Sequence, residues 1–355
     1  MDTSANEHGA IDYPLSSNCE DFLNDVMATN PMLNRKDDVH SGSPGHVSFA
    51  SNLEAWQSTT RLPCAIITSA AFSASCDYGE GRGDVVLISR DAVHFYVRRS
   101  RLLNASHTNF ASLLLLFISH DTTSEHVSPC ITLTEDANIL EIVLHVIYGT
   151  PYQQEGLDLG TLLEVIGTLH KYGIPLDTHV VLGQPLFEGI ALQMHQDALK
   201  VYIVAAQYDL FEMASIASSY LLNYPLVFLP KGTTSKLGPA YLHMLYSLQL
   251  ARVYLLQRIL TIAPEGHEPT VLCGRFEHEV VKSAWWHVTT DFASSAHADV
   301  STAEIREALY PVLLPLICAE CQNSVQRRID EAVLRWSRTP RTISRDMCEF
   351  YTVLA

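Results

Sequence analysis

The sequence predicts an α+β fold: a small sheet with a helical cluster at residues 76–182, followed by an all-helical C-terminal region. Three observations lead to this prediction. Two strand patterns stand close together within residues 84–98, helical patterns follow them, and beyond residue 185 only helical spacing recurs. Strands that come first and helices that come after are typical of α+β proteins, in which helices gather on one side of a sheet.

The strand patterns come first in the chain. Residues 84–88 form a short β-rich run that ends in polar turn residues. Val93, Phe95 and Val97 then alternate with more polar side chains, which is the period of a half-buried strand. We therefore expect these two runs to pair with each other, and we expect a further strand at residues 131–133.

Three helical stretches complete the predicted core. The first covers residues 102–110. The second, at residues 140–147, has apolar side chains at i, i+3, i+4 and i+7, which places them on one helix face. The third repeats this spacing at residues 159–169. Each helix therefore has one apolar face that can pack against the sheet or a neighbouring helix.

Two further helical regions are expected after this core. Residues 185–230 form a helical extension, in which apolar stripes recur at helical spacing. Residues 230–236 read Pro-Lys-Gly-Thr-Thr-Ser-Lys and are the best candidate for an internal linker. Residues 237–350 then form a separate helical C-terminal region.

The order of these segments resembles the BTB/POZ domain family. The similarity is strongest to the BTB-domain proteins expanded in mushroom-forming fungi, in which an all-helical tail follows the domain. The matching pieces are Asp84-Val85-Val86-Leu87, Phe95-x-Val97-x-Arg99, Leu103-x-x-Ser106-x-x-x-Phe110, Leu133-x-Glu135-Asp136, Ile147-Tyr148, and Leu162-Leu163 with Lys171-Tyr172-Gly173-Ile174. The chain departs from the family at Val97-Arg98-Arg99, where the family usually has His before its basic residue.

The resemblance implies a protein-interaction module that forms a homodimer and docks unidentified protein partners. The interface residues that it implies are Phe72, Asp84, Arg99, Leu102 and Leu103. Transcription regulation is one implied role, and substrate adaptor for a cullin-type ubiquitin ligase is the alternative. Family members that recruit a cullin often carry a hydrophobe-x-Glu signature before the strand at residues 131–133, and this chain has none there, so both roles stay open.

Composition and charge limit the classes of partner. The formal net charge is −16, which argues against direct nucleic-acid binding because such proteins need a basic surface. The longest aliphatic run covers residues 113–118 and is far shorter than the ~20 residues that cross a bilayer. Eight cysteines without framework spacing and no recognisable secretory signal indicate a cytoplasmic or nuclear location. Residues 1–65 are acidic and polar, which predicts a disordered tail.

A possible metal site lies in the C-terminal region. Cys318 and Cys321 have the Cys-x-x-Cys spacing with which two thiolates hold one zinc ion, and Cys273 and His278 are the expected remaining ligands. His287 is a competing fourth ligand. The resemblance adds support, because the fungal relatives share a Cys pair in this tail. The alternative interpretation is that the cysteines are small buried apolar residues.

Enzyme motifs are missing from the sequence. It contains no Gly-x-Ser-x-Gly nucleophile elbow and no phosphate-binding P-loop, and His278-Glu279 lacks the second histidine of a zinc-protease helix. We therefore expect a protein that is not an enzyme. An uncharacterised metal-dependent enzyme in the helical tail is kept as a second alternative.

Overall fold

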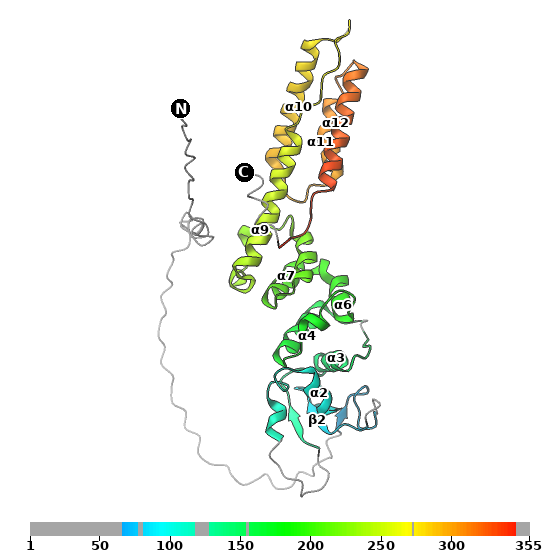
Figure 1. Cartoon of the computed structure of the whole chain (residues 1–355), viewed down its shortest axis with the longest axis vertical. Coiled ribbons are helices and arrows are strands. Elements are labelled where there is room, and N and C mark those ends of the chain that lie inside the picture. The colour runs from blue at the N-terminus through cyan, green and yellow to red at the C-terminus, as the bar shows by residue number, and fades with distance from the viewer. Residues whose placement is uncertain (1–65, 77–80, 118–127, 154–155, 272, 346–355) are drawn as a thin grey trace, which may run out of the picture. The chain divides into compact units, whose positions relative to one another are not determined.

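The computed structural model describes residues 66–76, 81–117, 128–153, 156–271 and 273–345 (Figure 1). The predicted acidic tail at residues 1–65 lies outside these residues. The described part is a mixed α/β protein with a small four-stranded sheet and a helical C-terminal region. This agrees with the predicted fold class at that level.

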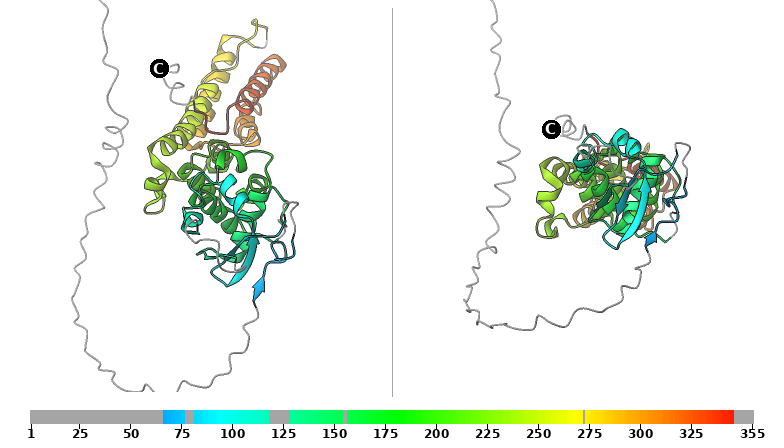
Figure 2. Two further views of the ribbon diagram at one scale, coloured as in Figure 1. Left: turned by 60° about the horizontal axis from the view of Figure 1, so that its bottom comes forward. Right: turned by 90° about the horizontal axis from the view of Figure 1, so that it is seen from below.

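The sheet has the strand order β1-β3-β2-β4, with β1 at Ile67–Thr68, β2 at Val85–Ile88, β3 at Val93–Val97 and β4 at Cys130–Thr132. Strands β2 and β3 form an antiparallel hairpin, which confirms the predicted pairing, whereas β1 runs parallel to β3 and β4 runs parallel to β2. In Figure 2 the blue and cyan strands lie side by side, and green helices pack next to them.

Four helices belong to the same part of the chain as the sheet: α2 (Arg99–Ala105), α3 (Ala137–Tyr148), α4 (Leu159–Lys171) and α5 (Leu176–His179). The apolar faces predicted for α3 and α4 are buried in the core, as expected from their spacing. A short 3-10 helix, η1 (Leu113–Phe117), follows α2.

Helix α2 ends earlier than the predicted stretch of residues 102–110. The Ser106 hydroxyl donates to the carbonyl of Tyr172 at 2.5 Å and accepts from the Phe110 amide at 2.8 Å. A serine side chain that bonds nearby backbone competes with continuation of a helix. The four residues after Thr108 have positive φ values between 51° and 62°, and the Phe110 ring stacks on Tyr172 at 4.1 Å. The contacts of Ser106 and Phe110 with Tyr172 therefore take the place of the helical turn expected at residues 106–110.

The helical extension contains α6 (Pro185–Gln193), α7 (Ala198–Gln207) and α8 (Phe211–Ser218), with short 3-10 turns η2 (Met194–Gln196), η3 (Ser219–Leu221) and η4 (Leu226–Phe228). Its buried side chains belong to one continuous core together with those of the sheet and α2–α4. The extension therefore adds to the first core and does not form a core of its own.

The C-terminal region contains α9 (Thr233–Leu260), α10 (Arg275–Ser295), α11 (Thr302–Leu309), η5 (Tyr310–Val312) and α12 (Ala319–Ser337). A second core lies among these helices and includes Leu256, Trp285 and Trp336. Helix α9 serves both cores, because its residues up to Leu248 belong to the first core and those from Leu256 belong to the second.

The predicted linker at residues 230–236 leads into helix α9, which begins at Thr233. Thr233 is buried, and so is Leu237 one turn later, whereas the other residues from 231 to 236 are exposed. The real irregularity comes next, at Gly238, whose φ of 68° kinks the helix just before Pro239. Glycine tolerates this left-handed backbone, and proline cannot continue the hydrogen-bond ladder of the preceding turn.

Candidate metal centre

Cysteine and histidine side chains converge where α9, α10 and α12 come closest to one another. His267 and Cys273 lie in the segment between α9 and α10, and His278 lies in the first turn of α10. Cys321 lies in the first turn of α12, and Cys318 caps the start of that helix. Two helix starts and one loop therefore supply all five side chains.

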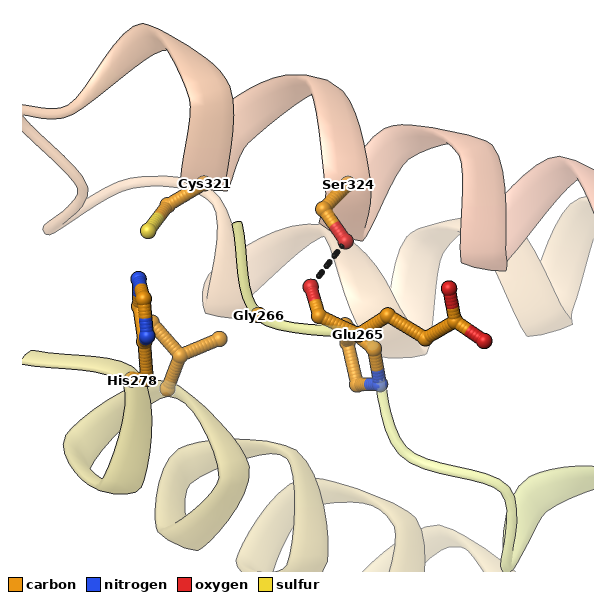
Figure 3. A pocket seen from close by; sticks show the side chains of 7 residues that line it. Glu265, Gly266, His278, Cys321 and Ser324 are labelled. Carbon is orange, nitrogen blue, oxygen red and sulfur yellow. Dashed lines mark hydrogen bonds between the residues drawn. The ribbon is translucent and has the colours of Figure 1, made fainter. Parts of the chain in front are cut away.

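Four of these side chains form a tight group. One ligand atom from each of His267, Cys273, His278 and Cys321 lies within 4.8 Å of every other. The two sulfurs of Cys273 and Cys321 are 3.5 Å apart, and Cys318 Sγ lies 3.2 Å from His267 Nε2. In Figure 3 the Cys321 sulfur faces the His278 ring across a small pocket.

The structure brings together most of the ligands that the sequence indicates. Cys273, His278 and Cys321 are in the group, and Cys318 lies beside it. The competing candidate, His287, is exposed on α10 and does not belong to it. Sequence analysis missed His267, because a histidine six residues before a cysteine is not a ligand spacing that stands out among 16 histidines.

Both histidines present a ring nitrogen to the group. The Nδ1 atom of His267 is 2.7 Å from the Glu268 carbonyl, so this nitrogen carries the proton and Nε2 is left with its lone pair. The Nε2 atom of His278 is buried and has no hydrogen-bond partner among the described residues. A buried polar atom without a partner is costly and calls for a bound species.

Backbone contacts hold the loop in this shape. The Ser324 hydroxyl of α12 donates to the Glu265 carbonyl at 2.6 Å, which fastens the loop to that helix (Figure 3). A Cβ atom at Gly266 would lie 3.0 Å from His278 Nδ1, so glycine is required for the ring to come this close. The Gly274 amide donates to Glu277 Oε2 at 2.7 Å and caps the start of α10.

The thiols are not electrostatically equivalent. The nearby Cys321 backbone, at the start of α12, lowers the pKa of the Cys318 thiol to about 7. Burial acts in the opposite direction on Cys321, whose pKa rises to about 12, and it also raises the pKa of Cys273.

No protein-family model, curated protein or solved structure matches this chain.

The predicted interface residues have different positions in the structure. Phe72 is fully buried, with its ring 5.1 Å from that of His145 and 5.5 Å from that of Tyr148, and Leu102 is also fully buried. Phe72 and Leu102 are therefore core residues and not the interface residues that were expected, because other parts of the same chain cover them. Leu103 is half-buried and packs against the same core.

The polar pair expected at the interface holds the start of α2. Asp84 is exposed, and its Oδ1 accepts the Arg99 amide at 2.7 Å. The Arg99 guanidinium donates to the Leu114 carbonyl at 2.9 Å.

Within the described ranges, no helix is both long enough and apolar enough to span a membrane.

Proposed function

We propose that this chain is a protein-interaction module, whose sheet-containing core resembles a BTB/POZ domain, forms a homodimer and docks other proteins. The observation that carries the proposal is the exposed edge of the sheet. Strand β1 stands at the end of the strand order, and the side chains of its residue Ile67 and of the preceding Ile66 are 60% and 66% exposed.

An edge strand offers backbone N–H and C=O groups to another chain. Soluble proteins commonly protect such an edge with charged residues or proline, because exposed apolar edges pair with other strands. Ile66 and Ile67 carry no charge, so a second strand could add to this edge by the hydrogen bonding used in strand-addition complexes. Self-association that buries these side chains is the simplest consequence.

The test is the molar mass of the full chain in solution. Size-exclusion chromatography with light scattering is expected to give twice the mass of one chain at micromolar concentrations. Replacing Ile67→Lys is expected to give the monomer, because a charge on the edge opposes strand addition. The matched control is Leu192→Lys, since Leu192 is 73% exposed on α6 and lies away from the sheet.

Two results would overturn this proposal. Wild-type protein that stays monomeric across micromolar concentrations excludes self-association as the function. A dimer that persists in the Ile67→Lys variant moves the interface away from β1.

For the docked partners, transcription regulators are the first proposal and a cullin-type ubiquitin ligase is the second. The nearest match to a hydrophobe-x-Glu signature ends at Glu135, which is only 9% exposed and bonds to Lys171 and Tyr172 of its own chain. It is therefore not available to a ligase scaffold. Affinity purification from cell extract separates the two roles by showing whether chromatin factors or a cullin co-purify.

A further inference from the structure

We propose that the C-terminal core holds one zinc ion, bound by His267, Cys273, His278 and Cys321. This inference is independent of self-association through the sheet. It adds His267 to the ligands indicated by the sequence, and it places Cys318 outside the coordination sphere.

The distances fit a tetrahedral zinc site. Zinc bonds of about 2.3 Å to sulfur and 2.0–2.1 Å to nitrogen place tetrahedral donors roughly 3.3–3.8 Å apart. The sulfurs of Cys273 and Cys321, 3.5 Å apart, already have this spacing. The four donor atoms all lie within 4.8 Å of one another, so small side-chain rotations bring the imidazoles to bonding distance.

The donor types select zinc over other common divalent ions. Thiolate sulfur and imidazole nitrogen are the ligands that zinc prefers, whereas magnesium and calcium require oxygen. Four protein donors fill a tetrahedral shell and leave no open position for a substrate. A closed shell of this kind is typical of structural zinc, not catalytic zinc.

The surroundings of the histidines match those of metal ligands. A ligating histidine usually donates its other ring N–H to a carbonyl or carboxylate, which fixes the tautomer. His267 makes this contact with the Glu268 carbonyl. A metal also gives the buried Nε2 atom of His278 the partner that it lacks among the described residues.

Cys318 has a different role in this arrangement. It is the N-cap residue of α12, and its side chain makes no capping hydrogen bond there. It also contacts His267 at 3.2 Å. Cys318 therefore lies beside the four-residue group, in contact with one of its histidines, whereas the other two cysteines bind the metal.

The first test measures metal in the full-length protein. After dialysis against metal-free buffer, plasma mass spectrometry is expected to find one zinc per chain. Cys273→Ser and Cys321→Ser are expected to lose most of it. Cys130→Ser is the matched control and is expected to retain it, because Cys130 is an exposed cysteine on β4.

The second test starts from the wild-type protein. Wild-type protein stripped of metal and titrated with Co²⁺ is expected to show the visible absorption of a tetrahedral site and sulfur-to-cobalt charge transfer, and Zn²⁺ is expected to abolish both. Cys318→Ser is expected to leave these bands in place, whereas His267→Ala is expected to weaken Co²⁺ binding at least tenfold.

Three outcomes would overturn the proposal. Wild-type protein without zinc and without cobalt–thiolate bands shows that there is no site. A Cys273–Cys321 disulfide found in freshly isolated protein assigns the pair to a cross-link instead. Loss of metal in Cys318→Ser combined with retention in His267→Ala shows that the ligand set is wrong.

Discussion

Glu135 illustrates how one buried carboxylate organises its surroundings. It follows β4, and it accepts hydrogen bonds from Lys171, from the Tyr172 hydroxyl at 2.5 Å and from the Thr134 amide at 3.1 Å. Burial opposes its ionisation, but these donors outweigh burial and hold the pKa of Glu135 below its usual value. Burial and the neighbouring carboxylate raise the pKa of Tyr172. The carboxylate thus ties the end of α4 to the sheet.

Replacing Glu135→Gln is expected to lower the free energy of unfolding by about 1–3 kcal/mol at neutral pH, because it removes a charged acceptor from buried donors. The folded pKa is below the ordinary value of 4.5, so the carboxylate stabilises the fold fully above that pH and progressively less as pH falls through the folded pKa. Urea denaturation between pH 7 and pH 3 should show the gap between wild type and variant closing in acid.

The matched control is Asp136→Asn. Asp136 pairs with Arg90 at 2.5 Å, but both side chains are substantially exposed, at 37% and 68%. Exposed pairs contribute at most about 1 kcal/mol, so this variant should stay close to wild type at every pH. A difference in unfolding free energy between wild type and Glu135→Gln that does not change with pH would show that the carboxylate acts only through packing.

At the candidate metal site, residue chemistry was predictable and loop geometry was not. A Cys-x-x-Cys pair limits the candidates to thiols and nearby histidines, which is why Cys273, His278 and Cys321 could be named from the sequence. In the proposed ligand set, His267 takes the place that was expected for Cys318. This difference depends on how the segment between α9 and α10 lies against α12. That path is set by tertiary contacts such as the Ser324 bond to Glu265, which leave no periodic signal in the sequence.

At the scale of elements, the helical spacing of apolar residues predicted the buried helix faces. The ends of helices, where side chains compete with the backbone for hydrogen bonds, did not follow from the sequence. Apolar side chains of α12, expected from helical spacing, are all buried: Val325, Ile329, Ala332, Val333 and Trp336. Asp209 lies just before α8 but does not cap it. Its φ is 53°, α8 starts after Leu210, and its carboxylate accepts the Tyr241 hydroxyl at 2.6 Å. The hydrogen bond from Tyr241, which is distant in the sequence, therefore fixes the Asp209 carboxylate away from the helix start.

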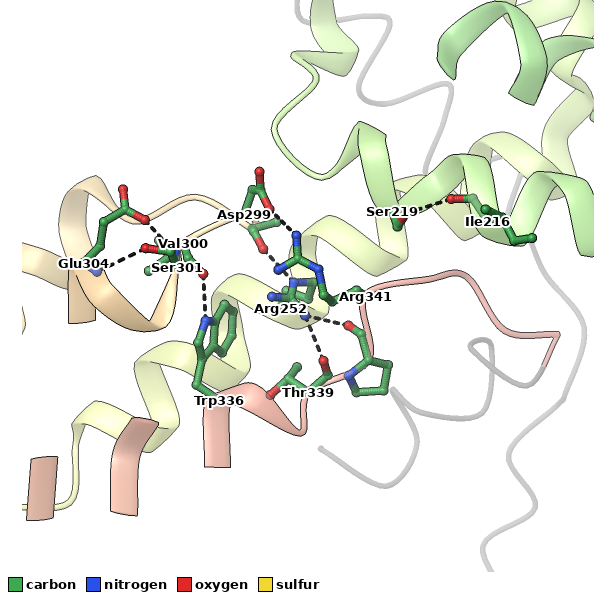
Figure 4. A network of polar contacts seen from close by, with 12 residues as sticks. Ile216, Ser219, Arg252, Asp299, Val300, Ser301, Glu304, Trp336, Thr339 and Arg341 are labelled. Atoms are coloured by element: carbon green, nitrogen blue, oxygen red, sulfur yellow. Dashed lines mark hydrogen bonds and ion pairs between the residues drawn. The ribbon is translucent and has the colours of Figure 1, made fainter. Parts of the chain in front are cut away.

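Arg252 joins elements that are far apart in sequence (Figure 4). It is 2% exposed on α9, and its guanidinium donates to the carbonyl of Ala298 at 2.6 Å and to those of Thr339 and Pro340 at 3.0 and 2.7 Å. It also lies 4.3 Å from the ring centre of Trp336. Burial lowers the pKa of Arg252 to about 10, so the group stays charged at neutral pH.

Replacing Arg252→Met is expected to lower the free energy of unfolding by about 2–5 kcal/mol, because the carbonyls of Ala298, Thr339 and Pro340 lose their donor. Arg252→Lys should be almost as harmful, since an ammonium cannot reproduce the planar fork that reaches separate acceptors. Urea denaturation measures both. The control is Arg258→Met on the exposed side of the same helix, which should change stability little. A stable Arg252→Lys variant would mean that charge alone suffices.

For the whole molecule, the sequence indicated a sheet-containing part and a helical part, and both exist. The change from the first core to the second falls within α9, between Leu248 and Leu256, and not at residues 230–236. A Pro- and Gly-containing segment has the composition of a linker, and only packing shows that it starts a helix. Helix α9 therefore contributes buried residues to both cores.

Tryptophan positions make the two cores distinguishable. Trp285, Trp286 and Trp336 lie in the C-terminal helices, and Trp56 lies outside the described residues. In a Trp56→Phe background, fluorescence reports only the second core.

With the proposed zinc bound, chelation is expected to lower the fluorescence-detected midpoint of thermal unfolding by about 10 °C, because each kcal/mol shifts the midpoint of such a protein by roughly 2–4 °C and metal binding contributes folding energy. Hydrogen exchange should accelerate in α10 and α12 and stay slow in β2 and β3. Equal acceleration in both parts would mean that the two cores unfold as one unit.

The last described residues return to the first core. Ile343 is 2% exposed there, its amide donates to Ser218 Oγ at 2.9 Å, and its carbonyl accepts the Ser215 hydroxyl at 3.2 Å. During translation, the ribosome releases this piece only after all the residues of the second core. The first core therefore stays open on one side while the chain is being made. Its closure waits until Ile343 has left the ribosome, and chains terminated before that residue expose the gap to chaperones and proteases.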